Sequence, residues 1–221
     1  MKLGVIAAMQ EELAAFDDHQ ATCAKLGIVL KLAGVCKVNA ALAAADLIWN
    51  HSVDQIIMIG TAGALDPQLD IGDIVIAHNA LQHDVDVRAL GFTWGQIPFE
   101  PDELFWHWHS NGRLFDAAWQ ATRTLGLRHK TGKILTGDRF VSDPEHAALL
   151  RSELHGTCIE MEGAAVAQVC TKLEVPWLIL RVISDRADHS SPVDFAQFLP
   201  RASGTLAKLV IEIAQDLNLP D

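Results

Sequence analysis

Short apolar segments alternate with longer amphipathic segments along the whole chain. The short segments are rich in Val, Ile and Leu at consecutive positions, which is typical of strands buried on both faces. The longer segments repeat apolar residues at intervals of three and four, as one face of a helix does. This alternation predicts an α/β fold with a mostly parallel sheet between helices. The predicted strands are residues 3–8, 28–32, 55–60, 73–77, 132–135 and 177–183, and the predicted helices are residues 38–50, 112–125, 143–154, 161–173 and 194–217.

Composition narrows the class of protein. Half of the 221 residues are hydrophobic and 20% are charged, as in a soluble folded domain, and no linker interrupts the chain, so we expect one domain over residues 1–221. The formal charge of −11 argues against nucleic-acid binding, which needs clustered Lys and Arg. No run of about 18 apolar residues is present to cross a membrane. The four cysteines lie far apart without metal-binding spacing, which predicts reduced thiols and a cytoplasmic location.

The segment 83–103 departs from the regular alternation. It places glycines and prolines among large apolar residues such as Phe92, Trp94 and Phe99. A loop of this length in a compact domain is usually functional. Its apolar side chains need a surface to cover, which is either a partner subunit or a ligand.

Candidate functional residues follow the predicted strands, because ligands of open α/β sheets bind beyond the carboxyl ends of the strands. Glu11 and Glu12 follow the first strand and Asp185 follows the last. Residues 60–64, Gly-Thr-Ala-Gly-Ala, are predicted to form a tight turn after the third strand. Residues 160–162, Glu-Met-Glu, stand where an apolar segment becomes an Ala-rich helix, and charges there are solvated, paired or in contact with a ligand. Each feature alone has an ordinary structural explanation, whereas the combination indicates a site.

Five segments together resemble one family. Residues 8–12 (Ala-Met-Gln-Glu-Glu), 60–63 (Gly-Thr-Ala-Gly), 160–162 (Glu-Met-Glu) and 181–185 (Arg-Val-Ile-Ser-Asp) are similar to signature segments of 5′-methylthioadenosine/S-adenosylhomocysteine nucleosidases, within the purine nucleoside phosphorylase superfamily. Residues 83–98 resemble the long loop of that family, and the resemblance extends from Met1 to about Phe198. It implies a three-layer αβα sandwich with a central mixed, twisted sheet, an adenine nucleoside as substrate, a homodimer, and neither a cofactor nor a metal.

The resemblance also implies a role for each residue of the site. Asp185 would protonate adenine N7 and Glu12 would activate water, and two carboxylates on different strand ends suit these acid and base roles. Glu162 would hold the ribose hydroxyls, with Met161 against the sugar. The other predicted contacts are Phe140 stacked on adenine, the backbone of Val141 at the adenine edge, Ser184 beside Asp185, Thr61 near the attacking water, Met9, Val35 and Phe195 around the 5′-alkylthio group, Phe92 and Pro98 from a partner subunit, and Ala62, Gly63 and Glu160.

The nature of the nucleophile can be argued from charge. A phosphorylase needs cations for phosphate, whereas Glu11 and Glu12 would repel it, so water is the predicted nucleophile. Arg181 is the nearest candidate cation, and the alternative is that it pairs with a buried acid such as Glu160. Three rival functions stay open: a nucleosidase of the same fold for another 5′-modified nucleoside such as 6-amino-6-deoxyfutalosine, a purine nucleoside phosphorylase, and a catalytically silent adenosine-binding domain.

Two departures from the family pattern bear on substrate choice. Residues 17–32 form a short connection where the family has a longer helix and hairpin, so we expect fewer or shorter strands there. Cys36 stands where the family usually has Gly. If that turn requires a positive φ, Cys36 costs on the order of 1 kcal/mol and reshapes the 5′ pocket.

Overall fold

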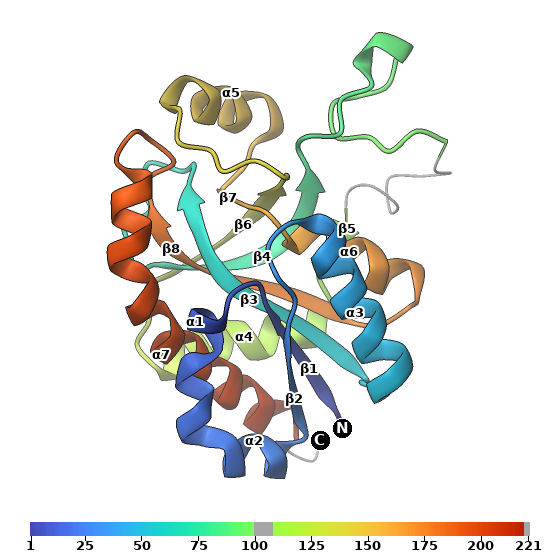
Figure 1. The fold of residues 1–221 in the computed structure, drawn as a ribbon, viewed down its shortest axis with the longest axis vertical. Coiled ribbons are helices and arrows are strands. Elements are labelled where there is room, and N and C mark those ends of the chain that lie inside the picture. Colours follow the sequence, from blue (N-terminus) through green and yellow to red (C-terminus); the bar gives the residue numbers. More distant parts are fainter. Residues whose placement is uncertain (100–107, 219–221) are drawn as a thin grey trace.

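The computed structural model describes residues 1–99 and 108–218 of the chain (Figure 1). Its strands are β1 (Leu3–Ala7), β2 (Ile28–Leu32), β3 (Gln55–Ala64), β4 (Ile74–Gln82), β5 (Trp108–His109), β6 (His129–Thr136), β7 (Cys158–Glu160) and β8 (Trp177–Asp185). Its helices are α1 (Gln10–Leu13), α2 (Gln20–Leu26), α3 (Lys37–His51), α4 (Gly112–Thr124), α5 (Pro144–Leu154), α6 (Gly163–Lys172) and α7 (Ser191–Leu217), with 3₁₀ helices η1 (Ala14–His19) and η2 (Arg88–Leu90).

In the described residues, eight strands form one mixed sheet. β1 lies between β2 and β3, and all three are parallel. β3 also pairs in parallel with β8, and the end of β3 pairs antiparallel with β7. β7 continues in parallel to β6 and β6 to β4, and β4 returns to β8 in antiparallel orientation. These pairings join β3, β8, β4, β6 and β7 in a closed ring, which β1 and β2 extend on one side.

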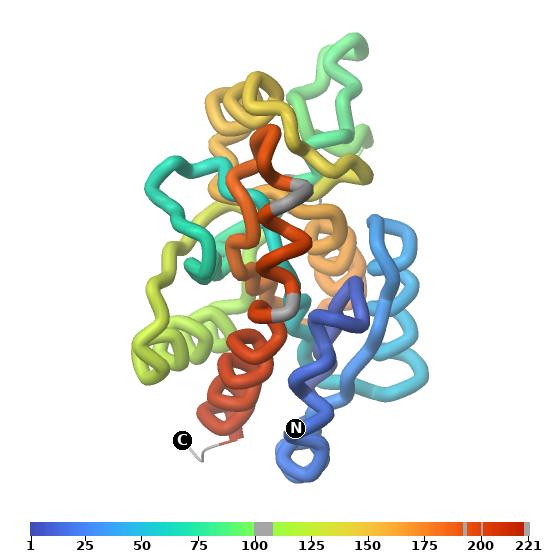
Figure 2. Tube along the Cα trace, turned by 60° about the vertical axis from the view of Figure 1, so that its left-hand side comes forward, coloured from blue at the N-terminus to red at the C-terminus, as the bar shows by residue number. Residues whose placement is uncertain are grey.

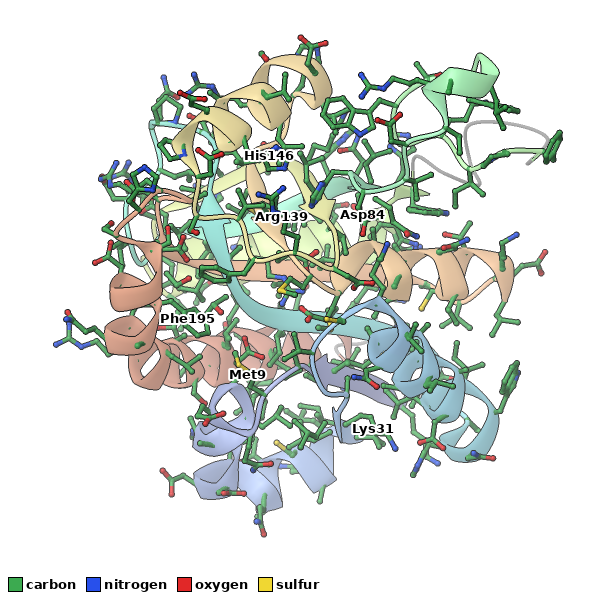
Figure 3. The ribbon with its side chains drawn as sticks, turned by 45° about the horizontal axis from the view of Figure 1, so that its top comes forward. Met9, Lys31, Asp84, Arg139, His146 and Phe195 are labelled. Carbon is green, nitrogen blue, oxygen red and sulfur yellow. The ribbon has the colours of Figure 1, made fainter. Side chains whose placement is uncertain are left out.

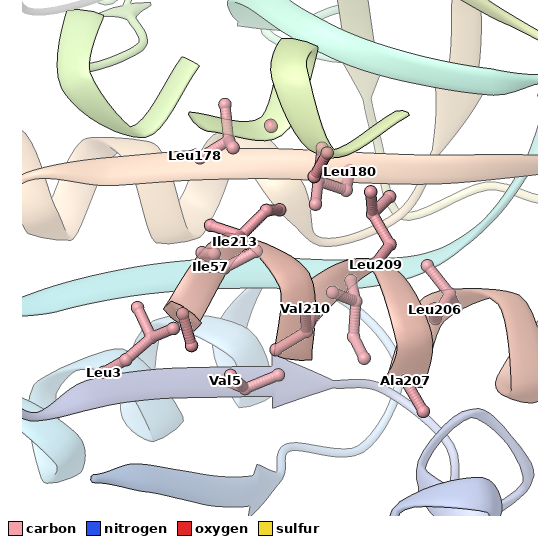
Figure 4. Close-up of a cluster of buried hydrophobic side chains, with 14 of the residues drawn as sticks. Leu3, Val5, Ile57, Leu178, Leu180, Leu206, Ala207, Leu209, Val210 and Ile213 are labelled. Carbon is pink, nitrogen blue, oxygen red and sulfur yellow. The ribbon is translucent and has the colours of Figure 1, made fainter. Parts of the chain in front are cut away.

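Helices cover both faces of the sheet, which confirms the predicted α/β class with a central mixed sheet. The face formed by Leu3, Val5 and the odd-numbered positions Ile57 and Ile59 packs against α1, η1, α2, α4 and α7. Figure 4 shows the part of this core between α7 and strands β1, β3 and β8. The alternate residues of the same strands, such as Ile6, face α3 and α6. α5 covers a third cluster near the ends of β6 and β7.

Local signals account for several element ends. Asp143 caps α5 by accepting the backbone N–H of Glu145 at 3.1 Å, and Pro144 occupies the first helical position, where its missing N–H costs nothing. Gly126 follows the end of α4 with φ of +64°, a conformation that glycine adopts readily. In the early segment, residues 17–32 contain the end of η1, the short helix α2 and one strand, β2.

Other predicted boundaries are wrong. The predicted turn at residues 60–64 is the second half of β3, because this stretch pairs with both β7 and β8. The predicted strand 73–77 continues to Gln82 for a similar reason, since it pairs with β6 along its length. β7 was not predicted as a strand, and the helix predicted from residue 161 begins at Gly163.

Residues 83–99, the described part of the long loop, are held together by contacts of their own aromatic side chains. Trp94 donates its indole N–H to the carbonyl of His83 at 2.7 Å, and the Arg88 guanidinium lies 4.4 Å from the Trp94 ring. Phe92 packs edge-to-face on Phe99, which is 90% exposed. The loop projects from the body of the protein in Figure 1, and residues 100–103 of the predicted loop lie outside the described residues.

Among the described helices, none has the length and apolar character needed to span a bilayer.

Candidate active site

A cavity of about 250 Å³ opens at the carboxyl ends of the strands. Its walls come from the β1–α1 junction, the β2–α3 turn, the ends of β3 and β8, the β6–α5 loop, the start of α6 and the beginning of α7. Met9, Arg139 and Phe195 lie around the opening from three of these elements (Figure 3). The predicted site residues that line the cavity are Met9, Glu12, Val35, Thr61, Ala62, Gly63, Phe140, Val141, Glu160, Met161, Glu162, Ser184, Asp185 and Phe195.

Glu12 is held by its carboxylate at the first turn of α1. One oxygen, Oε2, accepts the backbone N–H groups of Ala8 and Met9, both at 3.1 Å. The other, Oε1, accepts the backbone N–H of Thr61 at 3.0 Å and its hydroxyl at 3.3 Å. Burial raises the pKa of Glu12, and Arg181 and the three N–H donors oppose that rise. The carboxylate of Glu12 is therefore buried and held in one orientation by groups of the protein.

Arg181 is the buried counter-ion of the site. Its guanidinium pairs with Glu160, lies 3.7 Å from a carboxylate oxygen of Glu162 and donates to the carbonyl of Ile59 at 3.0 Å. The alternative in which Arg181 pairs with Glu160 is thus the one the structure adopts. A Cβ atom at Gly60 would lie 1.9 Å from Nη1 of Arg181, so the glycine is needed for clearance within a strand.

Glu160 is saturated by groups of the protein itself. Its carboxylate accepts the N–H groups of Glu162 and Gly163 at 3.2 and 2.8 Å, and it also bonds the Thr136 hydroxyl and Arg181. Although Glu160 lines the cavity, both of its oxygens are engaged. Its bonds favour a role in fixing the start of α6 and the guanidinium over the predicted direct contact with substrate.

Glu162 precedes α6 and faces the β2–α3 turn. Its Oε1 accepts the backbone N–H of Cys36 at 2.8 Å. Burial, followed by the charge of Glu160, raises the pKa of Glu162 to about 7 despite Arg181. Cys36 has φ of 80° and ψ of 160°, so the condition under which we expect it to be strained is met. With this pKa, Glu162 gains or loses its charge near neutral pH. Its hydrogen-bond donor, the backbone N–H of Cys36, belongs to a strained turn.

Asp185 ends β8 and is fixed by its neighbours. Oδ2 accepts the hydroxyl of Ser184 at 2.8 Å, and Oδ1 accepts the backbone N–H of Ala187 at 2.9 Å. A Cβ atom at Gly63 would lie 2.8 Å from Oδ1, so Asp185 occupies space that only glycine leaves open. Glu12 is thus held at Thr61 and Asp185 lies against Gly63, two residues further along β3. Two residues of extended strand span about 7 Å.

Aromatic side chains close the outer part of the cavity. Phe140, from the β6–α5 loop, and Phe195, from α7, pack edge-to-face with ring centres 6.0 Å apart. Phe140 is 45% exposed, whereas its neighbour Val141 is buried against α5. This arrangement leaves one aromatic face and one backbone edge for a flat ligand.

The residues that line the cavity are not all those predicted for the site. Phe92 and Pro98 do not line it; Phe92 instead lines a separate hollow beside Trp94 and Lys133. Their predicted contact from a partner subunit stays a prediction. Ala8, Arg139 and Ile159 also line the cavity, although they were not among the predicted site residues. Ala8 directly follows β1 and Arg139 lies in the loop after β6, so their position beyond a strand could have found them, whereas Ile159 lies within β7, which was not predicted. Within residues 1–99 and 108–218, no group of three His, Cys, Asp or Glu side chains is placed to hold a metal ion.

Comparison with known proteins shows which family the chain resembles. Residues 2–215 match the model of the phosphorylase superfamily. A 5′-methylthioadenosine/S-adenosylhomocysteine nucleosidase of Geobacillus kaustophilus (strain HTA426) is 37% identical, over 96% of each chain. The nucleosidase of that name from Shewanella denitrificans is 34% identical, over 98% of this chain and all of its own.

Solved structures agree with these sequence matches. The crystal structure of the Neisseria meningitidis nucleosidase in complex with methylthio-immucillin-A has a TM-score of 0.89 and 36% identity, over 97% of this chain and 99% of its own. A futalosine hydrolase mutant of Helicobacter pylori strain 26695 has a TM-score of 0.88 and 28% identity, over 98% and 99%. The chain belongs to the phosphorylase superfamily and, within it, to the 5′-methylthioadenosine/S-adenosylhomocysteine nucleosidase family.

Proposed function

We propose that the protein hydrolyses the N-glycosidic bond of 5′-methylthioadenosine and S-adenosylhomocysteine, releasing adenine and a 5-thioribose product. The observation that carries this proposal is the pair of fixed carboxylates in one cavity, Glu12 from α1 and Asp185 from the end of β8. Glu12 activates the attacking water and Asp185 delivers a proton to adenine N7. We expect the two carboxylates to flank one sugar, because their contacts on β3, Thr61 and Gly63, are two residues apart.

The remaining contacts follow from the walls of the cavity. Glu162 accepts hydrogen bonds from the ribose hydroxyls, with Met161 against the sugar. Phe140 stacks on adenine and the backbone of Val141 reads its edge, while Ser184 orients Asp185. Thr61 stands beside the water, with Ala62 and Gly63 along the floor. Met9, Val35 and Phe195 surround the 5′-alkylthio group.

Charge supports water as the nucleophile instead of phosphate. Glu12 stands at the position of the nucleophile in this scheme, and its carboxylate would repel a phosphate dianion there. The guanidinium of Arg181 is already engaged by Glu160 and Glu162. The reaction requires no metal or cofactor in this scheme.

The test is release of adenine from 5′-methylthioadenosine, with products separated by chromatography in the presence and absence of phosphate. Free adenine and free methylthioribose in both conditions are the expected result. A ribose-1-phosphate product that requires phosphate would make the protein a phosphorylase. Absence of release from this substrate and from S-adenosylhomocysteine would favour a silent adenosine-binding domain.

Two matched variants test the roles of the carboxylates. Glu12→Gln and Asp185→Asn each keep the size of the side chain and remove its acid–base function, so each is expected to lower turnover by at least about 100-fold while the protein stays folded. Near-full activity in either variant would contradict the assigned role.

A second substrate is favoured by one observation, the similarity to the Helicobacter pylori futalosine hydrolase. Both the strained Cys36 and the adjacent Val35 belong to the β2–α3 turn, which we assign to the ribose and its 5′ substituent. Side-by-side values of kcat/KM for 5′-methylthioadenosine and 6-amino-6-deoxyfutalosine rank the two substrates. If kcat/KM is higher for 6-amino-6-deoxyfutalosine than for 5′-methylthioadenosine, 6-amino-6-deoxyfutalosine becomes the assigned physiological substrate.

A homodimer is part of the same proposal, with Phe92 and Pro98 of each subunit completing the 5′ pocket of the other. Val38, Leu42 and Trp49 give α3 an apolar exposed face. Contiguous exposed apolar surface of this kind marks an interface. Light scattering after size exclusion is expected to give twice the chain mass of 24.1 kDa, and a monomer would contradict the assignment.

The cellular setting is also proposed. Cys23, Cys36, Cys158 and Cys170 are all free thiols, which supports a reducing, cytoplasmic location. There the whole chain acts as one nucleosidase domain in methionine salvage. Fractionation of cells that express the tagged protein checks the location, and a membrane or secreted fraction would contradict it.

A further inference from the structure

Ser203 is a buried hydroxyl in the middle of α7. Its side chain is 3% exposed, and its neighbour Ala202 belongs to the same apolar core as Leu13 and Phe16. A hydroxyl in an apolar core costs free energy unless it is hydrogen-bonded. The position of Ser203 is therefore informative through the groups that it bonds.

Those groups belong to the segment that carries Glu12. The hydroxyl of Ser203 accepts the backbone N–H of Ala15 at 2.8 Å and donates to the backbone carbonyl of Glu12 at 3.0 Å. An N–H and a carbonyl three residues apart are the pair that a 3₁₀ turn joins directly. Ser203 bridges this pair at the point where α1 ends and η1 begins. Figures 1 and 2 both show α7 alongside this part of the chain.

The position of Glu12 depends on such outside contacts. α1 contains only four residues, and a single helical turn has little stability of its own. On the cavity side, the Glu12 carboxylate bonds the N–H groups of Ala8, Met9 and Thr61. On the opposite side, Ser203 bonds the Glu12 carbonyl. The residue is thus held at both its side chain and its backbone.

We infer that Ser203 is a positioning residue for Glu12, which it holds in place for activation of the water nucleophile. This inference rests on the proposed function for the role of Glu12. Ser203 does not line the cavity. Its effect passes through the backbone of α1.

The first variant is Ser203→Ala, which leaves the Glu12 carbonyl and the Ala15 N–H without their bridge. kcat for adenine release is expected to fall about tenfold. KM is expected to stay within twofold, because ribose and adenine are held by Glu162, Phe140 and Val141. A purely structural role would lower thermal stability and leave kcat of the folded protein unchanged.

The pH profile provides a second readout. The charged groups facing Glu12 are Arg181 from β8 and Glu162 at the start of α6, and the variant leaves both in place. Hydrogen bonds to a carboxylate favour its charged form. If the bonds to Glu12 loosen, the acidic limb of kcat moves to higher pH, which a merely destabilised protein would not show.

Two controls complete the set. Ser203→Thr keeps the hydroxyl and is expected to restore most of kcat. Thr122→Val removes another buried hydroxyl, which donates to the Trp119 carbonyl at 2.8 Å within α4, and it is expected to leave kcat and the pH profile unchanged. If Ser203→Ala does not fold, Ser203→Cys, a weak donor of similar size, takes its place.

A final measurement does not depend on turnover. In protein labelled with ¹³C at the glutamate carboxyl carbon, the Glu12 resonance is assigned by its loss in Glu12→Gln. The chemical shift of this resonance is followed as a function of pH. The pH midpoint of its titration is expected to be higher in Ser203→Ala than in the wild type, and unchanged in Thr122→Val. An unchanged midpoint together with unchanged kcat would overturn the inference. Absence of adenine release by the wild type would instead refute the proposed function, and the titration would still decide the role of Ser203.

Discussion

Cys36 donates its backbone N–H to the Glu162 carboxylate at 2.8 Å from a backbone conformation that almost only glycine adopts. With φ of 80° and ψ of 160°, the residue stores strain on the order of 1–3 kcal/mol. That conformation aims the N–H at the carboxylate that we assign to the ribose. The strain is thus located where it orients a binding group.

Replacing Cys36 with glycine is expected to increase the free energy of unfolding by about 1 kcal/mol. Glycine removes the strain, and its greater freedom in the unfolded chain offsets part of the gain. Urea denaturation measures the change. Cys36→Ala keeps a Cβ and is the matched control, which should show no such gain. Equal stability of the glycine and alanine variants would contradict strain at this turn.

Gly63→Ala is expected to lower kcat by about 100-fold or more without unfolding the protein. The added Cβ would lie 2.8 Å from Oδ1 of Asp185 and 3.2 Å from Cβ of Ala187, so Asp185 must move away from its position. Gly112→Ala is the control, since a Cβ there meets nothing within 4 Å. Steady-state kinetics and circular dichroism of both variants make the comparison, and full activity of Gly63→Ala would count against the placement of Asp185.

Glu162 is expected to make stability fall as pH rises between about 4.5 and 7. Its pKa is raised from the usual 4.5 to about 7 in the folded protein, so the native state binds more protons than the unfolded state in that window. Glu12, whose pKa is also raised, acts in the same direction. Glu162→Gln should flatten the decline, as measured by urea denaturation at pH 5, 6 and 7. If the free energy of unfolding of Glu162→Gln falls with pH as steeply as that of the wild type, Glu162 is not the cause of the decline.

Arg181→Met is expected to destabilise the protein by about 3–5 kcal/mol, because Glu160 and Glu162 would remain buried without their counter-ion. Arg186→Met is the control, since Arg186 pairs with Asp70 at 2.9 Å on the surface, where such a pair contributes about 1 kcal/mol or less. Chemical denaturation measures the free energy of unfolding of both variants. Similar losses in the two variants would mean that Arg181 does not neutralise the buried acids.

Most of the sheet could be predicted from local patterns, because its long strands are buried on both faces and read as apolar runs. β7 has three residues and β5 has two, too few for any periodicity to emerge. The wrong turn at residues 60–64 has a clear cause. Small residues look like a turn locally, whereas Gly60 and Gly63 are small in order to admit Arg181 and Asp185.

The site was predictable to the extent that its residues stand at strand ends. That position, together with the family resemblance, brought Glu12, Glu162 and Asp185 into one cavity. The pairing of Arg181 with Glu160 was one of two alternatives that sequence could not separate, since both residues are charged and near apolar segments. The contact between Ser203 and Glu12 joins residues 191 positions apart, and no local pattern reports it.

That separation has a consequence for synthesis of the protein on the ribosome. The first strand, with Leu3 and Val5, is covered by residues of α7 such as Val210 and Ile213 (Figure 4). A nascent chain therefore exposes its N-terminal strand, and lacks the full support of Glu12, until the last helix has left the exit tunnel. Exposed apolar surface of this kind is what chaperones bind and what leads to aggregation. Chains terminated before residue 203 are therefore expected to be inactive and to depend on chaperones.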